Sequence, residues 1–490
     1  MTQNAVVDST NPGIGEDDAT ASRNRVAIVL LLIAVFVVFL NETVMSVAVP
    51  DIMKDLNITP SAGQWLTTAF ALTMAVVIPT TGWLLERLNT RPVFVTAMSL
   101  FSAGTLIAAT SPSFGLLIVG RVVQATGTGI MMPLLFTTVL QLVPLADRGR
   151  MMGRISIVIS VAPAIGPAIS GLVLTVLPWR FLFWLVLPIA VTVLIIGIFR
   201  VPNVTEPRKA PLDILSVVLS ALAFSGVVYG LSGLGATAEG AAVIAPWIPL
   251  TIGAVFLVLF VLRQLQLQKT DRALLDLRTF LSRTFTLSIV LLSIMMISLF
   301  GMVIVLPMYV QRVLGDEPLV IGLLLLPGGL IMGLLGPLVG RLYDRFGPRP
   351  LLAPGAAVVS LGFWGLAMLD QNSPLWLVLV SHVVLSIGLG FLFTVLFTVG
   401  TAALPPHLYS HGSATIATIQ QVAGAAGTAA FIALLAAGTA AAGGTDAEHA
   451  QAAQIAVGVH WAFLTGAIVS LAAIVIAAFI KRPVAPEVEV

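Results

Sequence analysis

Apolar residues form long runs along most of the chain, and short polar gaps separate these runs. The first run begins at Val26 and extends to Val49, with Asn41 and Glu42 near its end. A helix needs about 20 mainly apolar residues to cross the hydrocarbon core of a bilayer. This run therefore predicts a membrane-spanning helix. Thirteen further runs of suitable length follow, at residues 62–85, 92–110, 114–141, 152–177, 181–199, 212–235, 243–263, 285–310, 318–341, 350–369, 375–402, 411–437 and 458–480.

The composition supports this interpretation. Hydrophobic residues make up 58% of the 490 positions and charged residues 9%, whereas a soluble domain has about 25% charged residues. The predicted fold class is an all-α integral membrane protein. Because the basic residues are spread over short gaps, we expect the lipid bilayer, and no nucleic acid, as a partner. The chain has no cysteine, which excludes disulfides and cysteine-ligated metal sites.

The distribution of lysine and arginine predicts the orientation of the spans. Of the 24 such residues, twenty lie in the tails or in the even-numbered gaps between spans, when the ends of the spans are counted with the gaps. Lys54, Arg180 and Arg312 lie in odd-numbered gaps, and Arg121 lies within the fourth span. Because lysine and arginine concentrate in cytoplasmic loops, both termini are predicted to be cytoplasmic.

One polar pattern occurs twice. Residues 82–92 (GWLLERLNTRP) follow the second span, and residues 340–350 (GRLYDRFGPRP) follow the tenth. Such a repeat predicts two similar halves, and the offset of eight spans places two extra helices between halves of six. The segment between the inserted helices and the second half could be an amphipathic helix at the headgroups or a plain linker. The predicted organisation is a disordered tail at 1–22, a first half at 23–200, two inserted helices at 201–265, a cytoplasmic linker at 266–284, a second half at 285–482 and a tail at 483–490.

Glu42 is the one acid that falls clearly within a predicted span. An intramembrane carboxylate is energetically expensive and usually faces a protein interior or a water-filled cavity. Burial disfavours the charged form of a carboxylate, so Glu42 could exchange a proton near neutral pH and serve in proton coupling. The alternative is a purely structural hydrogen bond between Glu42 and a neighbouring helix.

Two basic side chains also lie well inside predicted spans. Arg121, Gln124 and Thr128 follow at intervals of three and four residues, so they share one helical face. An arginine within the membrane needs an anion or carbonyl groups nearby. His382 is the one histidine well inside a span. It could titrate near neutral pH or hydrogen-bond a neighbouring helix.

Small residues and prolines alternate in the fifth span. Ala162, Gly166 and Ser170 form a stripe of small side chains, which lets a partner helix approach closely. The adjacent stripe contains prolines, which are expected to bend the helix. That stripe consists of Pro163, Pro167 and Gly171.

With these motifs in this order, the chain after its tail resembles the fourteen-helix drug:proton antiporter family of the major facilitator superfamily (EmrB/QacA type), and within it the lincomycin-resistance branch. The resemblance rests on the two repeated stretches, on the Arg-x-x-Gln pattern at 121–124, and on the placement of Gly and Pro in the fifth span. It implies the fold of this superfamily and an export function. It also implies a role in opening and closing for the motif residues of the two repeats, which are Gly82, Glu86, Arg87, Arg91, Asp344, Arg345 and Arg349.

The sequence departs from the family pattern at the end of the first span. The family has an aspartate where this chain has Asn41, and the acid follows one residue later, at Glu42. One residue corresponds to about 100° of rotation on a helix, which puts a direct transfer of the aspartate's role to Glu42 in doubt. The resemblance implies that Arg121 assists proton transfer, and a structural pairing of Arg121 is the alternative.

The function implied by the resemblance is proton-coupled efflux of amphipathic compounds from the bacterial inner membrane, by alternating access and from a cavity that opens inward between the halves. No Gly-x-x-x-x-Gly-Lys-[Ser/Thr] phosphate loop is present, so we expect a proton gradient as the energy source, with no cofactor and no enzymatic activity. We expect a monomer, and the sequence does not specify a periplasmic adaptor. The alternatives are a proton-driven exporter of one endogenous metabolite, lipid or siderophore, and a sensor or scaffold that does not transport.

Overall fold

The computed structural model describes residues 13–204, 207, 211–238, 244–443 and 451–481, and within these ranges it contains helices and no strands. Fourteen of these helices are long and apolar enough to cross a membrane. Helices suit the hydrophobic runs because a helix pairs its backbone groups within the segment, whereas lipid offers them no hydrogen-bond partners. The predicted fold class and number of spans are therefore confirmed.

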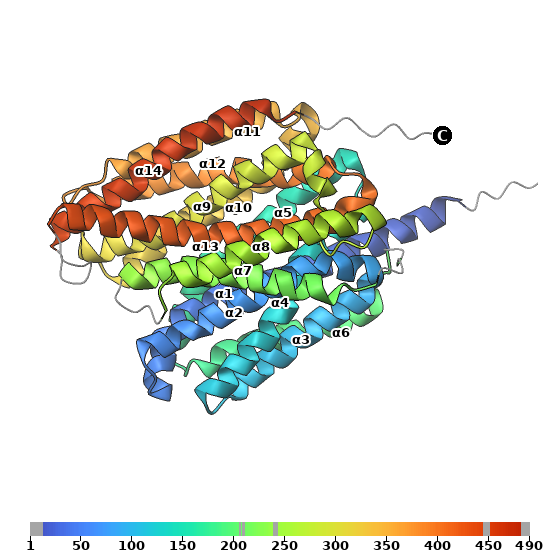
Figure 1. Cartoon of the computed structure of the whole chain (residues 1–490), viewed down its shortest axis with the longest axis horizontal. Helices are drawn as coiled ribbons and strands as arrows, with labels where there is room; N and C mark the ends of the chain where they lie inside the picture. Colours follow the sequence, from blue (N-terminus) through green and yellow to red (C-terminus); the bar gives the residue numbers. More distant parts are fainter. Residues whose placement is uncertain (1–12, 205–206, 208–210, 239–243, 444–450, 482–490) are drawn as a thin grey trace, which may run out of the picture.

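The helices follow one another with short connections (Figure 1). Six helices come first: α1 (Gly13–Leu56), α2 (Pro60–Arg87), α3 (Thr90–Thr110), α4 (Phe114–Leu142), α5 (Arg148–Leu174) and α6 (Arg180–Arg200), with the 3₁₀ helix η1 (Leu145–Asp147) before α5. Two helices are inserted: α7 (Ile214–Ala238) and α8 (Trp247–Leu267), followed by η2 (Gln268–Thr270) and η3 (Leu277–Leu281). Six more complete the chain: α9 (Arg283–Arg312), α10 (Pro318–Phe346), α11 (Arg349–Ala367), α12 (Leu375–Ala402), α13 (Tyr409–Ala441) and α14 (Ala452–Phe479), with η4 (Pro406–Leu408) before α13.

The first helix is longer than predicted. It begins at Gly13, so residues 13–22 are helical although the sequence predicts a loose tail there. No proline lies between Gly13 and Val26, and a helix once nucleated in the apolar segment propagates at one hydrogen bond per residue. Residues 1–12 of the predicted tail, and the predicted tail at 483–490, lie outside the described residues.

The linker before the second half is compact and is not one continuous amphipathic helix. Asp276 accepts a hydrogen bond from the backbone N–H of Arg278 at 2.9 Å, and its carboxylate also pairs with the Arg278 guanidinium. Arg278 forms a second ion pair with Asp271, which has a left-handed backbone conformation with φ 52°. These charges fold the segment back on itself between η2 and η3.

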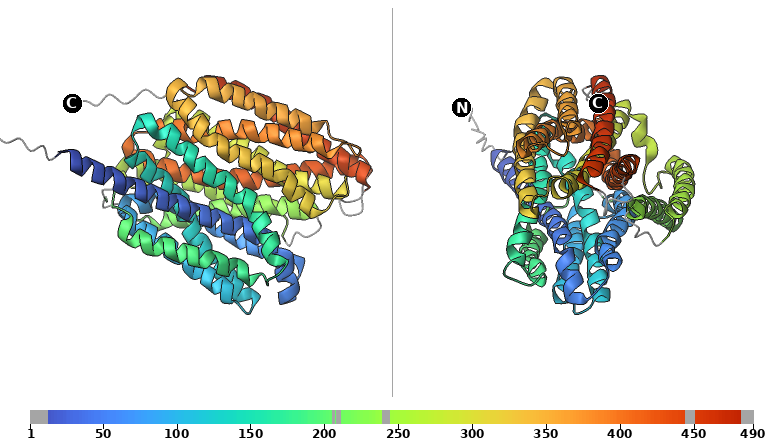
Figure 2. Two further views of the ribbon diagram at one scale, coloured as in Figure 1. Left: turned by 180° about the vertical axis from the view of Figure 1, so that it is seen from behind. Right: turned by 90° about the vertical axis from the view of Figure 1, so that its left-hand side faces the viewer.

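The two sets of six helices lie side by side, and the two inserted helices lie along one flank (Figures 1 and 2). Contacts between the sets run mainly along two seams, α2 with α13 and α5 with α10. Helix α7 packs on both α2 and α13 and so covers the first seam, whereas α8 packs outside α7. The beginning of α1 and the end of α14 lie at the same end of the bundle (Figure 1). We refer to this end as the terminal end and to the opposite one as the far end.

Candidate functional site

A buried arginine lies at the centre of a polar cluster in the first set of helices. The Arg121 side chain on α4 is 1% exposed. Its Nη1 donates hydrogen bonds to Oε1 of Gln124 at 2.6 Å and to Oδ1 of Asn41 at 3.4 Å, and its Nε donates to the carbonyl oxygen of Leu66 at 3.4 Å. The guanidinium carbon is 4.0 Å from the centre of the Phe70 ring. Neutral acceptors and an aromatic face therefore hold this cation in place.

Gln124 extends the cluster to α3. Its Nε2 donates to Oγ1 of Thr105 at 2.8 Å. Helices α3 and α4 come this close because Gly104, on α3, has no side chain. A Cβ on Gly104 would lie 2.4 Å from the backbone nitrogen of Gln124. The predicted Arg-x-x-Gln face thus connects α1, α2, α3 and α4.

Glu42 lies beside this cluster but does not belong to its hydrogen-bond network. Asn41, the residue at the family's acidic position, makes the contact with Arg121. Within the described residues, no hydrogen bond or ion pair joins Glu42 to Arg121, although the two side chains are near enough to interact electrostatically. Glu42 is half-buried, and Ser46, one turn later on the same side of α1, is exposed. Glu42 and Arg121 are therefore not in direct contact in this conformation.

The small-residue stripe of α5 packs against α1. A Cβ on Gly166 would lie 2.1 Å from Oγ1 of Thr43, and Ser170 donates its hydroxyl to the carbonyl oxygen of Val44 at 3.0 Å. Pro163 and Pro167 lie inside α5. At Gly171, by contrast, a Cβ would meet nothing within 4 Å. The close approach of α5 to α1 therefore depends on the stripe that contains Gly166. This packing positions the segment of α1 that carries Glu42.

His382 lies in the other set of helices. Its side chain is buried on α12, with Nε2 3.3 Å from the carbonyl oxygen of Leu325 on α10. A Cβ on Gly328 would lie 2.3 Å from the same nitrogen. The structure thus does not bring His382 into the Arg121 cluster, and its contacts fit the interhelical hydrogen bond that the sequence offered as the alternative to proton exchange.

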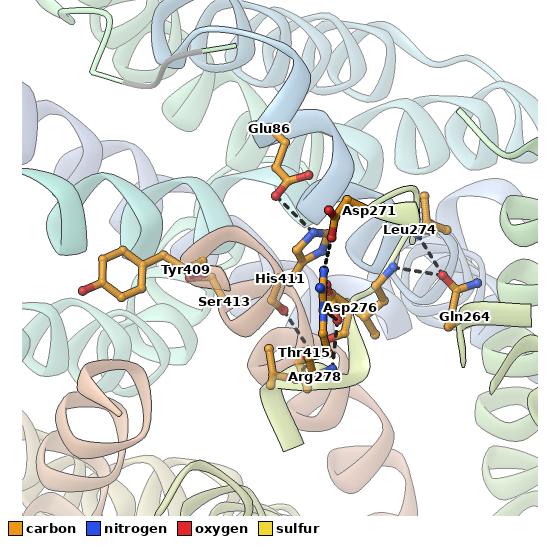
Figure 3. A network of polar contacts seen from close by, with 12 residues as sticks. Glu86, Gln264, Asp271, Leu274, Asp276, Arg278, Tyr409, His411, Ser413 and Thr415 are labelled. Carbon is orange, nitrogen blue, oxygen red and sulfur yellow. Dashed lines mark hydrogen bonds and ion pairs between the residues drawn. The ribbon is translucent and has the colours of Figure 1, made fainter. Parts of the chain in front are cut away.

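The first repeated stretch contacts the second set of helices at the terminal end. Oε1 of Glu86, at the end of α2, is 3.1 Å from Nε2 of His411 in the first turns of α13 (Figure 3). Gly82 allows this approach, because a Cβ there would lie 3.0 Å from Nδ1 of His411. The arginines of this stretch face elsewhere. Arg87 lies over the ring of Trp83, and Arg91 donates to the carbonyl oxygen of Val201 at 2.7 Å.

The second repeated stretch makes the equivalent contact on the other seam. The two carboxylate oxygens of Asp344, on α10, accept hydrogen bonds from the backbone N–H groups of Gly149 and Arg150, both at 2.9 Å. These N–H groups belong to the first turn of α5, where a carboxylate satisfies unpaired donors and interacts favourably with the helix dipole. A Cβ on Gly340 would lie 2.1 Å from the carbonyl oxygen of Gly149. Arg345 lies over the ring of Phe346, and Arg349 begins α11.

The acids of the two repeats therefore join the halves. Their partners are a histidine in one case and backbone amides in the other. A further contact was missed from sequence: Nη1 of Arg148, the first residue of α5, donates to the hydroxyl of Tyr409, the first residue of α13, at 3.2 Å. Each residue begins a helix after a short 3₁₀ turn, and this shared position is the signal that could have paired them.

The linker also reaches this end of the seam. Oε1 of Gln264, on α8, accepts hydrogen bonds from the backbone N–H groups of Leu274 and Leu275 at 2.8 and 3.3 Å (Figure 3). A Cβ on Gly82 would lie 3.4 Å from the carbonyl oxygen of Leu274. The linker therefore packs against α2 beside the Glu86–His411 pair. Among the described residues, no group of three or more His, Asp or Glu side chains could hold a metal ion.

The two halves pack tightly at the terminal end and in the adjoining part of the bundle. The rings of Phe136 and Phe397 stack with their centres 4.9 Å apart, and the hydroxyls of Ser156 and Thr394 are 2.8 Å apart. These residues belong to a core that contains side chains from both halves. The buried apolar cluster at the far end of the first half, from Leu40 to Phe183, contains residues of α1 to α6 alone. The structure is therefore closed at the terminal end, whereas the sequence predicted a cavity open to that side.

The sequence of this bundle matches a known family. Residues 31–428 match the family model described as Major Facilitator Superfamily. The chain belongs to this superfamily. The uncharacterized MFS-type transporter YcnB of Bacillus subtilis is 38% identical over 464 residues, which cover 94% of this chain and 96% of YcnB. The lincomycin resistance protein LmrB of Listeria monocytogenes is 39% identical over 390 residues, which cover 80% of this chain and 82% of LmrB.

Solved structures agree with the assignment to the major facilitator superfamily. The human organic anion transporter MFSD10 (TETRAN) matches with a TM-score of 0.66 over 93% of this chain and 99% of that chain, at 15% sequence identity. At this identity the likeness concerns the fold alone. The chain is thus a multi-pass membrane protein with the fold of this superfamily.

Proposed function

We propose that this protein exports amphipathic compounds across the bacterial inner membrane in exchange for protons, by alternating access. The observation that carries the proposal is the closed terminal end, where each repeated stretch contacts the first turns of a helix from the opposite half. These contacts are few and polar, so they can be exchanged for contacts at the far end when the halves rock. The similarity to a lincomycin resistance protein supports an antibiotic-like substrate.

With both termini in the cytoplasm, as the distribution of lysine and arginine predicts, the present conformation is closed toward the cytoplasm. Opening of the terminal end would then require the loss of the contacts between Asp344 and α5 and between Glu86 and His411. The fixed hydrogen bonds of Arg121 lie within one half, so this cation moves with the first half as a rigid unit.

Glu42 is the proton-coupling group in this mechanism. It is half-buried and lies on the side of α1 that carries the exposed Ser46. In its charged form it is attracted by Arg121, whose own hydrogen bonds are satisfied by other groups. Protonation from the outside removes this attraction, and deprotonation toward the cytoplasm restores it. Because Glu42 and Arg121 belong to the same half, their attraction is the same in both conformations, and the coupling comes from the change in the solvent exposure of Glu42 when the halves rock. A charged carboxylate favours the conformation in which it is better solvated, so the protonation state of Glu42 changes the relative energies of the two conformations.

The test compares the wild-type protein with Glu42→Gln in proteoliposomes that have an imposed pH gradient. Lincomycin and a panel of lipophilic cations serve as substrates, and a pH-sensitive dye records proton movement. We expect substrate-induced proton movement with the wild type, and a signal like that of empty liposomes with Glu42→Gln, because glutamine cannot exchange a proton. Glu317→Gln is the matched control, since Glu317 is exposed and its side chain does not cap α10.

Wild-type coupling in Glu42→Gln would contradict the assignment of Glu42 and leave the antiport proposal standing. Absence of substrate-induced proton movement in the wild type, with every compound of the panel, would contradict the antiport proposal itself.

A further inference from the structure

A cavity of about 300 Å³ lies in the seam between α5 and α10. Arg150, Arg154, Pro337 and Arg341 line it. Arg150 and Arg154 lie in the first two turns of α5, and Arg341 lies near the end of α10. The cavity is therefore at the terminal end, and both halves of the protein contribute to its wall.

The three arginines have more donors than the protein fills. A guanidinium carries five N–H donors. Arg154 makes no hydrogen bond or ion pair within the described part of the chain, and the bond of Arg341 is from its Nε to the carbonyl oxygen of Pro337 at 3.3 Å. Arg150 lies 3.4 Å from Asp147, but both side chains are 54% exposed, so this pair contributes little.

The nearby acid does not neutralise the cavity. Both oxygens of Asp344 accept hydrogen bonds from the backbone N–H groups of Gly149 and Arg150. Asp344 and Asp147 together offset two of the three positive charges of Arg150, Arg154 and Arg341, so the surroundings of the cavity keep an excess of positive charge.

The surface next to the cavity is apolar. Leu338 and Leu334 precede Arg341 by three and seven residues, so all three lie on one face of α10. Leu338 is 44% exposed and Leu334 is 67% exposed. A basic group at the end of a membrane helix, followed by exposed leucines toward the membrane interior, fits a molecule with an anionic head and an apolar chain. No other helix covers this seam from outside in the described structure, whereas α7 covers the seam between α2 and α13.

We propose that this cavity binds a phosphate group, carried by an anionic phospholipid or present as inorganic phosphate. Arginine suits such a ligand because its planar fork donates two hydrogen bonds to phosphate oxygens. Arg150 and Arg154 belong to one half and Arg341 to the other, so the bound phosphate bridges the halves. It stabilises the closed terminal end because the bridge exists in that conformation.

The experiment uses the full-length purified protein in detergent and three probes: a short-chain phosphatidylglycerol, a short-chain phosphatidylcholine and inorganic phosphate. Isothermal titration calorimetry measures the affinity for each. The test variant is the double substitution Arg154→Gln and Arg341→Gln. The control is Arg200→Gln with Arg283→Gln, which removes the same charge from two exposed arginines that do not line the cavity. Thermal unfolding of each variant checks that it is folded.

We expect the test variant to bind phosphatidylglycerol about 30-fold more weakly than the wild type, because each basic side chain near an anionic lipid contributes to the attraction. The control should bind like the wild type. Loss restricted to phosphatidylglycerol identifies a lipid ligand, and a parallel loss of inorganic phosphate binding identifies the free anion.

Two results would overturn the proposal. The first is equal affinity of the folded test variant and the wild type for all three probes. The second is an equal loss of affinity in the test and control variants, which would mean that general surface charge, and not this cavity, attracts the anion.

Discussion

Single residues decide how closely the helices of the two halves approach. Gly149 and Gly340 face each other across the seam between α5 and α10, and a Cβ on either would lie less than 3 Å from the opposite helix. Contact at this distance brings Asp344 within hydrogen-bond reach of the first turn of α5. The glycines of the two repeated stretches, Gly82 and Gly340, therefore lie where the other half leaves little room for a side chain.

Replacement of Gly340 by alanine should open the terminal end. The new Cβ would lie 2.1 Å from the carbonyl oxygen of Gly149, which is backbone and cannot move alone. Helix α10 must therefore shift away from α5. The chain has no native cysteine, so cysteines can be introduced at the beginning of α5 and at the end of α10. Spin labels on these cysteines measure the distance between the two helices at the terminal end. We expect a longer distance in Gly340→Ala, and no change in Gly322→Ala, where a Cβ meets nothing within 4 Å.

At the scale of helices, an aspartate whose carboxylate accepts several hydrogen bonds links the two inserted helices, α7 and α8. Asp213 precedes α7 and accepts hydrogen bonds from Nε and Nη2 of Arg263 on α8, at 3.1 and 2.9 Å. Its carboxylate also accepts from the hydroxyl and the backbone N–H of Ser216. The hydrogen bonds from Arg263 lower the pKa of Asp213 to about 2. Gln264 then connects α7 to the linker through Ser216 and Leu274.

The contact of Asp213 predicts a pH dependence of stability. Because the pKa of Asp213 is lower in the folded protein than its ordinary value of about 3.9, the carboxylate stabilises the fold above that value and loses this effect as the pH falls toward about 2. Thermal unfolding in detergent should therefore show Asp213→Asn to be less stable than the wild type, by an amount that is constant from pH 8 to about pH 5 and shrinks below about pH 4. A difference that grows on acidification would contradict this assignment.

At the scale of the whole molecule, the orientation in the membrane decides which way this conformation faces. The closed end carries the beginning of α1 and the end of α14 (Figure 1). It also carries the arginines of the two repeated stretches and the linker. The charge asymmetry of the sequence predicts that this end is cytoplasmic.

Fusions at the C-terminus test this orientation. Green fluorescent protein should be fluorescent in the fusion, and alkaline phosphatase should be inactive, because the enzyme requires the periplasm for activity. The matched control is a truncation after α13, which changes the side on which the fusion lies and should reverse both results. Active alkaline phosphatase on the full chain would contradict cytoplasmic termini, and the closed end would then lie on the periplasmic side.

The sequence predicts the fold of this protein far better than it predicts the contacts of its site. Long apolar runs leave a chain in lipid no choice but helices, so the fourteen spans follow directly. The rotation of 100° between Asn41 and Glu42 likewise warned that the acid is not at the family's position, and the structure shows Asn41 on Arg121. The closed end was not predictable in this way. Contacts such as Glu86 with His411 join residues far apart in the chain, and no local pattern encodes them.

The position of α7 gives the molecule two unlike flanks in the plane of the membrane. One flank presents the outer face of α8. The other presents the seam between α5 and α10, which no further helix covers in the described structure. If two copies associated through α8, the seam between α5 and α10 of each copy would stay in contact with lipid. Each copy could then work independently. Two copies that associate through α5 and α10 would obstruct the rocking of the halves. A neighbouring protein that packs against the outer face of α8 therefore leaves the seam between α5 and α10 free to open.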